Sequence, residues 1–461
     1  MKGITEMQNI YTPNDFKHLD SDSKMIQAAV DEAAKYGVKV VVPRVNERTG
    51  ECKWELEESI KLHTGSYVLL DNCYIRLKDD TYIHFFENDS ADDFGEWYMS
   101  KNRQYDIQLI GEGNVVLDGG KHNGIFEKDF NIYDENGNFV KSIKYKGLPS
   151  IAINRGLEFR NVERITVKGL RFINLRYWAM CFEFCSYGHI ADINFEALGN
   201  VPNQDGIDIR VGCNNFLVEN IYGLTGDDTI ALTNFAGRFL ETSDMDTSIH
   251  DIIITNIRSY QSDNCDIIRI LNRGGGVIYN VQISNVVDIT PEYKKDRALA
   301  AIRIGDICDY PSRLNTPGET RNIIIRDVVT RARFGAYIAN TVVDSTFDNF
   351  MMTSDGGIGI YFNGCYIENV YINKFMYNTL HSAPESDIGY QEVFHRVKID
   401  TLNALHFNNC EAKNLNVTNL VTGKNLTYAF GGNSEIEIKT KNVVMQDENT
   451  KLSEKPIIVN L

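Results

Sequence analysis

Short stretches in which apolar and polar residues alternate recur along the chain. They are rich in β-branched residues, and alternation with a period of two is typical of β-strands. The clearest stretches cover residues 179–184, 206–210, 229–233, 267–271 and 301–304. No helical periodicity separates one stretch from the next, which argues against alternating strands and helices. The pattern therefore predicts an all-β chain.

A second pattern accompanies these stretches: an apolar residue, any residue, then Asn, Asp or Gly, then another apolar residue. Its third position is occupied by Gly169, Asp192, Asn220, Asn256, Asn285 and Asp327, with weaker copies at Asn349 and Asn419. From Gly169 to Asn349 the copies are 22 to 42 residues apart, a period typical of solenoids. Asn, Asp and Gly tolerate the left-handed backbone conformation and suit a fixed corner in each repeat. The two patterns predict a single-stranded parallel β-helix.

The segment from Ser21 to Gly37 has a helical pattern instead. One face of a helix there would carry Met25, Ala28, Ala29 and Val30. Ser21 or Ser23 could cap the start of the helix, and Gly37 could end it. A solenoid needs a cap at its open end, so we expect this helix to be an N-terminal cap.

These patterns predict one domain that spans residues 1–461. Its cap region covers about residues 1–40, its coils about 41–433, and its C-terminal tail, with one or two strands, about 434–461. Long polar segments interrupt the period at about 120–150, 235–249, 290–318 and 380–395. Insertions in solenoids form loops, often on the binding face.

Carboxylates precede two neighbouring strands, in the segments NQDGIDIR (203–210) and TGDDTIAL (225–232). Aligning the strands by their apolar alternation matches Ile207 with Ile230, Ile268 and Ile302. This register places Asp205, Asp228 and Asp266 in one column, with Asp227 beside Asp228. A second column then holds Asp208, Ala231, Arg269 and Arg303. We expect these acidic and basic side chains to share one surface.

Carboxylates this close repel each other, so at least one should keep its proton to an unusually high pH. Glycoside hydrolysis uses such a pair, with one protonated acid and one ionised carboxylate. An inverting enzyme needs about 6.5–9.5 Å between the two groups, to leave room for water. Turn capping is the alternative reading of an Asp at a strand entry. A Ca²⁺ or Mg²⁺ site is another, but Arg269 and Arg303 would oppose a cation, so we expect neither metal nor cofactor.

The composition narrows the classes of partner. A formal net charge of -16 argues against nucleic acid, because phosphate binding needs clustered Lys and Arg. The nine cysteines include no CxxC pair, which favours a reducing compartment. Residues 1–16 lack the apolar core of a signal peptide, and no apolar run is long enough to span a membrane. We therefore expect a cytoplasmic protein without a membrane partner, and the oligomeric state stays open.

The two Asp motifs resemble the signature of glycoside hydrolase family 28, the polygalacturonase-like enzymes. The Gly-rich segment 111–120 and the segment SKMIQAAVDEA (23–33) are also similar to segments of that family. The resemblance covers roughly residues 20–340. It implies a right-handed parallel β-helix that hydrolyses a glycosidic bond in an oligo- or polysaccharide with inversion. It also implies that Asp227 is the general acid and that Asp205 and Asp228 activate the attacking water.

Two departures from the family change the expected substrate. The family has Gly-His-Gly where the register places Asp266, and Arg-Ile-Lys where this chain has Arg303, Ile304 and Gly305. In the family that Arg and Lys hold a galacturonate carboxylate. Losing the lysine and gaining Asp266 makes a neutral oligosaccharide the expected substrate. Besides Asp266, the residues expected to bind it are Asn203, Arg269, Arg303 and Trp178.

Trp178 could stack on a sugar, but β-helices also stack aromatic residues in their cores.

Two other classes of function stay open. The same fold could carry a polysaccharide lyase, an epimerase or a glycosyl transferase. It could also form a β-helix that binds glycans without catalysis.

Overall fold

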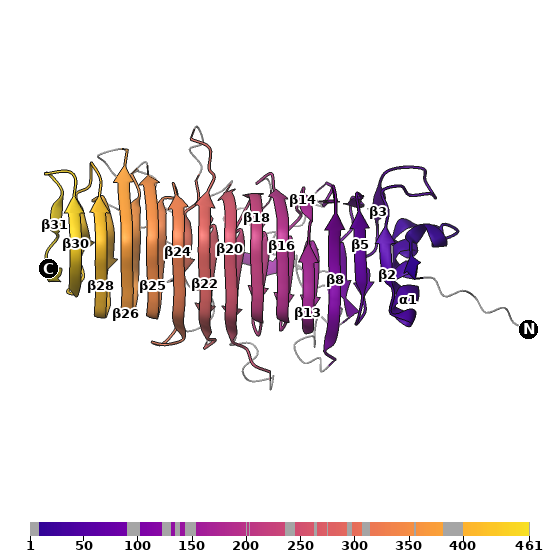
Figure 1. The fold of residues 1–461 in the computed structure, drawn as a ribbon, viewed down its shortest axis with the longest axis horizontal. Coiled ribbons are helices and arrows are strands. Elements are labelled where there is room, and N and C mark those ends of the chain that lie inside the picture. The colour runs from indigo at the N-terminus through magenta and orange to yellow at the C-terminus, as the bar shows by residue number, and fades with distance from the viewer. Residues whose placement is uncertain are drawn as a thin grey trace, which may run out of the picture. The chain divides into compact units, whose positions relative to one another are not determined.

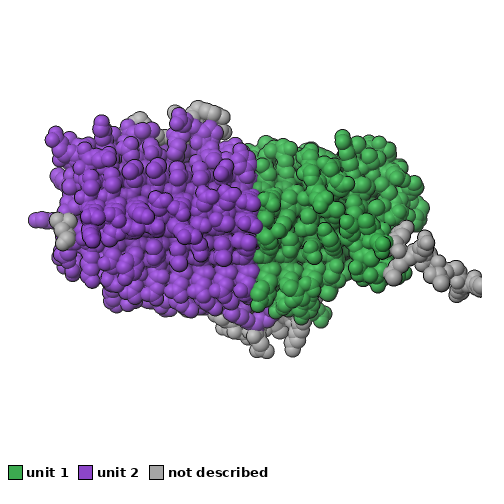
Figure 2. Space-filling view, viewed as in Figure 1, with its two compact units in different colours: residues 1–204 green, residues 205–461 purple. Residues whose placement is uncertain are grey.

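The structure is a computed structural model of the chain. It describes residues 9–89, 102–121, 131–133, 139–142, 154–199, 201, 203–235, 245–261, 265–273, 275–292, 297–306, 314–354, 356–380 and 400–460. The chain divides into two compact units, unit 1 (residues 1–204) and unit 2 (residues 205–461), which Figure 2 colours separately. The single domain over residues 1–461 stays a prediction. The predicted insertions at about 120–150, 235–249 and 380–395 lie largely outside the described residues, whereas the one at about 290–318 contains a strand of the coils, β23 (Ala300–Ile304).

Unit 1 begins with a short helical region and continues as a stack of strands (Figure 1). Its elements are β1 (Ile10–Tyr11), η1 (Pro13–Phe16), α1 (Asp22–Tyr36), β2 (Lys39–Val42), β3 (Trp54–Leu56), β4 (Ile60–Leu62), β5 (Tyr67–Asp71), β6 (Tyr74–Leu77), β7 (Phe86–Asn88), β8 (Gln104–Glu112), β9 (Val116–Asp118), β10 (Asn131–Tyr133), β11 (Phe139–Ser142), β12 (Leu157–Arg160), β13 (Val162–Lys168), β14 (Arg171–Ile173), β15 (Met180–Glu183) and β16 (Ser186–Glu196). The described strands form three parallel ladders, β2-β5-β8-β13-β16, β3-β6-β9-β14-β16 and β4-β7-β12-β15. Only β10 and β11 pair antiparallel among these described strands.

Unit 2 continues the same pattern with longer strands. Its elements are β17 (Ile207–Arg210), β18 (Asn214–Thr225), β19 (Ile230–Phe235), β20 (Ile249–Gln261), β21 (Ile268–Arg273), β22 (Ile278–Asp288), β23 (Ala300–Ile304), β24 (Thr320–Thr330), β25 (Phe334–Ser354), β26 (Ile358–Thr379), β27 (Asn403–Asn408), β28 (Glu411–Thr422), β29 (Tyr428–Gly432), β30 (Glu437–Met445), β31 (Lys451–Ser453) and β32 (Ile458–Asn460). One parallel ladder runs β17-β19-β21-β23-β25-β26-β27-β29-β31. The other runs β18-β20-β22-β24-β25-β26-β28-β30-β32. The prediction of an all-β parallel β-helix is confirmed.

The core of unit 2 is a stack of apolar side chains in register. One column consists of Ile207, Ile230, Ile268, Ile302, Ala336, Ile360, Leu405 and Phe430, all fully buried. Burying one such large apolar side chain contributes about 1.5–3 kcal/mol. A one-residue slip would turn every member of the column toward the other face, so the column fixes the register.

The corners of the coils are as predicted. All eight residues predicted there have a left-handed backbone, with φ between +54° and +71°. A second set of corners was not predicted, at Asn215, Asp251, Asn280 and Asn322, with φ of +55° to +56°. Their side chains connect neighbouring coils: Asn280 Nδ2 donates to Asp251 Oδ1 at 3.0 Å, and Asn322 Nδ2 donates to Asn280 Oδ1 at 3.3 Å.

The predicted capping helix is present as α1. Ser21 is its N-cap and accepts a hydrogen bond from the Lys24 N–H, and Gly37 ends it in the left-handed conformation. Its buried apolar face differs slightly from the prediction, because Ile26 and Ala33 are buried whereas Ala28 is half-buried. In the part of the chain that the structure describes, no helix has the length and hydropathy needed to cross a bilayer.

Side chains of α1 satisfy the backbone edge of the first coil. Asp22 accepts from the Glu55 N–H at 2.8 Å, and Ser23 Oγ accepts from the Glu57 N–H at 2.9 Å. Gln27 accepts from the Lys61 N–H at 2.7 Å and donates to the Lys61 carbonyl at 3.1 Å. Unpaired strand edges invite pairing with other chains, so α1 protects this end of unit 1.

The C-terminal tail is more regular than the sequence suggested. We expected one or two strands after residue 434, but β30, β31 and β32 all pair in the two ladders. The prediction fell short because exposed residues obscure the alternation. In β30, for example, Lys441, Asn442 and Val444 are all exposed.

Candidate active site

The structure confirms the predicted register around the acidic residues. Cα partners run from Ile207 to Ile230, Ile268 and Ile302, and from Asp208 to Ala231, Arg269 and Arg303. Asp205, Asp228 and Asp266 each lie two residues before the isoleucine of their strand, which is Ile207, Ile230 or Ile268. Backbone hydrogen bonds hold them on successive coils: the Gly206 N–H donates to the Asp228 carbonyl at 2.9 Å, and the Thr229 N–H donates to the Asp266 carbonyl at 3.2 Å.

Asp205, Asp227 and Asp228 form one compact cluster. One carboxylate oxygen from each lies within 4.8 Å of those of the other two. Asp205 and Asp228 are buried, and Asp227 is half-buried. The approach is closer than the gap of about 6.5–9.5 Å that we expected for an inverting pair. Such proximity in a poorly hydrated site strengthens the repulsion between ionised forms.

Burial and repulsion raise the proton affinity of two of these acids. Burial first, and then the charges of Asp227, Asp208 and Asp228, raise the pKa of Asp205 well above its ordinary value. Burial and the charge of Asp228 raise the pKa of Asp227 to about 7, although a hydrogen bond with the Cys265 thiol and the charge of Arg269 lower it. The cluster therefore holds at least one proton near neutral pH.

Asp266 and the two arginines form a chain of ion pairs that continues from this cluster. Arg269 Nη1 lies 3.4 Å from Asp228 Oδ2, and Arg269 Nη2 lies 3.2 Å from Asp306 Oδ2. Arg303 pairs with Asp266 Oδ2 at 3.3 Å and with Asp306 Oδ2 at 2.8 Å. Burial raises the pKa of Asp266 to about 7 even though Arg303 lowers it. Asp306, which joins both arginines, was not predicted from the sequence.

The structure also explains the missing lysine at position 305. Gly305 has φ of +71°, and a Cβ atom there would lie 2.1 Å from the Ala339 carbonyl oxygen. A residue with a side chain therefore does not fit this backbone. The carboxylate of Asp306 follows directly, where it neutralises the arginines instead of adding a third cation.

Buried hydroxyl and amide groups form a hydrogen-bonded network next to the acidic cluster. Thr225 Oγ1 donates to the Asp227 carbonyl at 2.8 Å and lies 3.0 Å from Thr229 Oγ1. Gln261 Nε2 donates to Thr229 Oγ1 at 2.7 Å and to the Asp266 carbonyl at 3.2 Å. The network thus fixes the backbone of Asp227, which belongs to the cluster, and of Asp266 beside it. The sequence signal for it was the presence of Thr225 and Thr229 on either side of the Asp pair.

Asn203 and Trp178 belong to unit 1, whereas the acidic cluster belongs to unit 2. Asn203 is half-buried and has a left-handed backbone with φ of +58°. The ring of Trp178 stacks on Tyr177, with centroids 4.8 Å apart, and the Arg155 guanidinium lies 4.5 Å from its centroid. Packing within unit 1 therefore already uses much of the Trp178 ring. A sugar-binding role for either residue stays a prediction.

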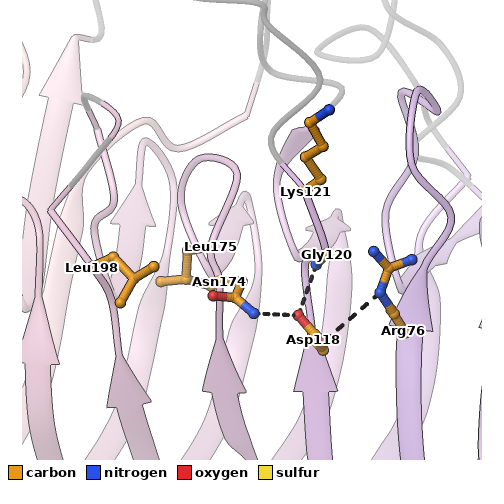
Figure 3. A pocket seen from close by; sticks show the side chains of 7 residues that line it. All are labelled: Arg76, Asp118, Gly120, Lys121, Asn174, Leu175 and Leu198. Carbon is orange, nitrogen blue, oxygen red and sulfur yellow. Dashed lines mark hydrogen bonds and ion pairs between the residues drawn. The ribbon is translucent and has the colours of Figure 1, made fainter.

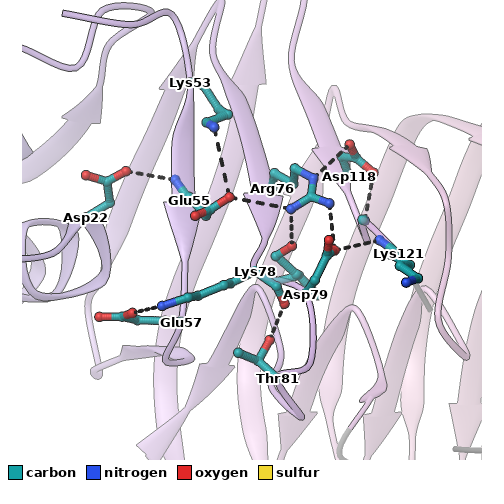
Figure 4. A network of polar contacts seen from close by, with 12 residues as sticks. Asp22, Lys53, Glu55, Glu57, Arg76, Lys78, Asp79, Thr81, Asp118 and Lys121 are labelled. Carbon is teal, nitrogen blue, oxygen red and sulfur yellow. Dashed lines mark hydrogen bonds and ion pairs between the residues drawn. The ribbon is translucent and has the colours of Figure 1, made fainter. Parts of the chain in front are cut away.

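Unit 1 has a hollow of its own, with a volume of about 500 Å³ (Figure 3). It is lined by Arg76, Asp118, Gly120, Lys121, Asn174, Leu175 and Leu198. Asp118 at its base accepts from Gly120 N–H, Asn174 Nδ2 and the Tyr74 hydroxyl. Arg76 lies in a polar network with Asp79 and Glu55 (Figure 4). The charged groups around this hollow form hydrogen bonds and ion pairs with their neighbours, which is typical of a structural network.

Comparison with known proteins supports the resemblance. The family described as Glycosyl hydrolases family 28 matches residues 70–260, which include Asp205, Asp227 and Asp228. The match ends before Asp266, so the departures at Asp266 and Gly305 lie beyond it. The resemblance to this family is confirmed over that range, and the identity to the solved structures is low.

Solved structures similar to this chain include both enzymes and an adhesin. A family 28 exopolygalacturonase from Yersinia enterocolitica is 13% identical, with 95% of this chain and 78% of that chain covered and a TM-score of 0.47. A polygalacturonase from Erwinia carotovora is 12% identical, with coverage of 100% and 99% and a TM-score of 0.41. The surface adhesin PfbA of Streptococcus pneumoniae is 12% identical, with coverage of 96% and 93% and a TM-score of 0.51. At such identities the likeness concerns the fold alone. The family match supports the coarser class, a carbohydrate-active β-helix protein.

Proposed function

We propose that this protein is a glycoside hydrolase that cleaves a glycosidic bond in an oligo- or polysaccharide. The observation that carries the proposal is the Asp205, Asp227 and Asp228 cluster, in which three carboxyl groups meet within 4.8 Å. Asp227, whose pKa is about 7, is protonated at neutral pH for a large part of the time. It is therefore suited to give a proton to the leaving oxygen.

Asp205 and Asp228 are the proposed partners for the attacking water, which gives inversion at the anomeric carbon. Asp228 is held in place by the Asp266 N–H at 2.9 Å and by Arg269. Asp205 has a buried oxygen, Oδ1, with no hydrogen-bonding partner among the described residues. The short spacing is nearer to the separation of about 5–5.5 Å found in retaining enzymes. The configuration of the released sugar is therefore the decisive test of this mechanism.

The charge of the site favours a neutral substrate. Among the described residues, the site has five carboxyl groups and two guanidinium groups. The carboxyl groups are those of Asp205, Asp227, Asp228, Asp266 and Asp306, and the guanidinium groups are those of Arg269 and Arg303. A uronate would bring one more negative charge into a site with an excess of carboxylates. A neutral oligosaccharide avoids this cost.

The test uses the wild type and Asp227→Asn with a panel of uronic and neutral oligosaccharides, followed by NMR. We expect an inverted product from a neutral substrate and a loss of about 10²–10⁴-fold in rate in the variant. Asp327→Asn, a change at an exposed corner residue, is the matched control. Activity unaffected by Asp227→Asn would contradict the assigned acid, and a retained configuration would contradict inversion.

One observation favours a second candidate, a β-helix that binds glycans without catalysis. Asp205 and Asp228 are 6% and 2% exposed, which limits their access to a substrate. The adhesin PfbA, a protein of similar structure, shares this fold. Glycan binding that is unchanged by Asp227→Asn, with no product from any substrate, would favour this candidate. A product that absorbs in the ultraviolet would instead indicate a lyase.

A further inference from the structure

Asp306 occupies a central position among the charged residues beyond the acidic cluster. Its Oδ2 atom accepts from Arg269 Nη2 at 3.2 Å and from Arg303 Nη2 at 2.8 Å. The side chain of Asp306 is 2% exposed, whereas that of Arg269 is 17% exposed. One buried carboxylate therefore holds two guanidinium groups, of which Arg269 is the more accessible.

Each arginine also pairs with a further carboxylate, and the Arg303 guanidinium lies 5.2 Å from the centroid of the Tyr337 ring. Arg269 Nη1 reaches Asp228, and Arg303 Nη1 reaches Asp266. Three carboxyl groups thus surround two cations. A guanidinium that already pairs with carboxylates has less attraction left for another carboxylate, because the carboxylates beside it offset its positive charge and repel a further anion.

We propose that Asp306 is a specificity-determining residue that makes this site reject sugars bearing a carboxylate. It adds a third carboxyl group to the two, those of Asp228 and Asp266, that already pair with Arg269 and Arg303, so carboxyl groups outnumber guanidinium groups there. Gly305 adds no compensating cation, because its backbone excludes a side chain. The inference rests on the proposed function in one respect, namely that a sugar binds beside Asp228.

Asp306→Asn tests the proposal, because it removes one negative charge with little change in shape. The probes are pairs of galacturonate, glucuronate and mannuronate oligosaccharides, each with its methyl ester. The ester is a neutral counterpart of the acid, so the ratio of the two dissociation constants reports charge alone. We expect at least one acid to bind the variant about tenfold or more tightly than the wild type, with its ester little changed. Isothermal titration calorimetry at fixed ionic strength measures this.

Two further variants separate the proposal from a general change in charge. Asp288→Asn removes another buried carboxylate of unit 2, one that accepts from Thr290 and Arg331 N–H groups, and should leave the ratio unchanged. Adding Arg269→Gln to Asp306→Asn should abolish the gain for the acid. A folded Asp306→Asn protein in which no acid gains affinity, or in which acid and ester gain equally, would overturn the proposal.

A third variant decides the matter if Asp306→Asn does not fold. Arg269→Lys alone keeps the positive charge and should change the affinities for acid and ester by the same factor, since Asp306 already pairs with Arg269. A selective loss of acid binding would show that Arg269 holds the carboxylate in the wild type and would refute the inference. These readouts are binding constants, so they stand apart from the proposed function, which is tested by product formation in the wild type.

Discussion

The protonation of Asp227 gives the proposed reaction a defined pH dependence. A general acid must carry its proton, and burial together with the charge of Asp228 raises the pKa of Asp227 to about 7. We therefore expect kcat/KM to fall by about tenfold per pH unit above about pH 7. A pH–rate profile of the wild type with its best neutral substrate measures this. A profile that stays flat to pH 9 would contradict the role of Asp227 as the acid.

The same carboxyl group links stability to pH. Its folded pKa lies above the ordinary value of 3.8, so the folded state binds more protons between about pH 4 and pH 7. The free energy of unfolding therefore decreases as pH rises through this window and is not affected further by Asp227 above it. Asp227→Asn removes this penalty and should stabilise the protein by about 1 kcal/mol or more at pH 8.

Urea denaturation of wild type and Asp227→Asn at pH 5 and pH 8 measures the difference. The increase in the free energy of unfolding caused by Asp227→Asn should be smaller at pH 5, where the wild-type carboxyl group is largely protonated in the folded state. Asp327→Asn serves as the control, because Asp327 is exposed. A variant that is less stable than the wild type at pH 8 would show that the carboxylate of Asp227 is stabilising.

At the residue scale, the sequence could predict which acids share a surface but not how they pair. The alternation of apolar residues determines the register, and the register places Asp205, Asp228 and Asp266 in one column. Asp306 follows the end of β23, where no alternation indicates the direction of its side chain. Its partner Arg269 is 37 residues away in sequence and lies on a neighbouring coil. The hydrogen bond between Cys265 and Asp227 was missed for a similar reason, because a lone cysteine carries no motif.

At the scale of one element, the corner residues connect each coil to the next. Asn256 has φ of +56°, donates to Asn220 Oδ1 and accepts from Asn285 Nδ2 at 3.3 Å. Asn256→Ala loses both hydrogen bonds and forces a β-carbon into the left-handed region, so it should destabilise the protein by about 1–2 kcal/mol. Asn256→Gly should cost less, because glycine adopts this conformation without strain.

Chemical denaturation gives the free energies of unfolding for this comparison. Arg258→Ala changes an exposed residue of the same strand, β20, and should fall within about 0.5 kcal/mol of the wild type. Equal losses for the alanine and glycine variants at position 256 would mean that the hydrogen bonds, and not the backbone conformation, determine the stability of the corner.

The buried network beneath the acidic cluster leads to a second prediction at this scale. Thr229 is fully buried, and its hydroxyl group lies 2.6 Å from Ser259 Oγ and 2.7 Å from Gln261 Nε2. Thr229→Val keeps the shape but removes the hydroxyl group from both of these buried contacts, which should cost about 1–3 kcal/mol. Thermal and urea unfolding measure the loss. Thr255→Val, at a half-buried threonine, is the control, and a loss of equal size there would contradict a special role for the network.

The sequence predicted some elements well and others less well, for physical reasons. The corners of the coils were predictable because few residues tolerate a left-handed backbone. The second set of corners, at Asn215, Asp251, Asn280 and Asn322, was not predicted, although it lies in the same strands as predicted corners such as Asn220 and Asn256. The tail has three strands where one or two were expected, because its outward residues are exposed and give a weak pattern.

At the scale of the whole molecule, repetition made the fold class predictable. One coil supplies little evidence, but many copies of the same short pattern leave few other folds possible. The insertions do not repeat, so the sequence gives no basis for their conformation. The apolar stack of unit 2 and its corners therefore followed from the sequence, whereas the surroundings of the candidate site did not.

The end of a stack is the point at which a repeat fold is most exposed to other chains. Helix α1 satisfies backbone N–H groups of Glu55, Glu57 and Lys61 through its side chains and covers the first coil. Deleting residues 1–37 should leave this strand edge open, and the protein should then form oligomers or aggregates. Size-exclusion chromatography with light scattering measures the change.

Ser23→Ala combined with Gln27→Ala keeps the helix but removes two of its edge contacts, so it should weaken the cap without full aggregation. A deletion variant with the same oligomeric state and stability as the full chain would show that the first coil needs no cap.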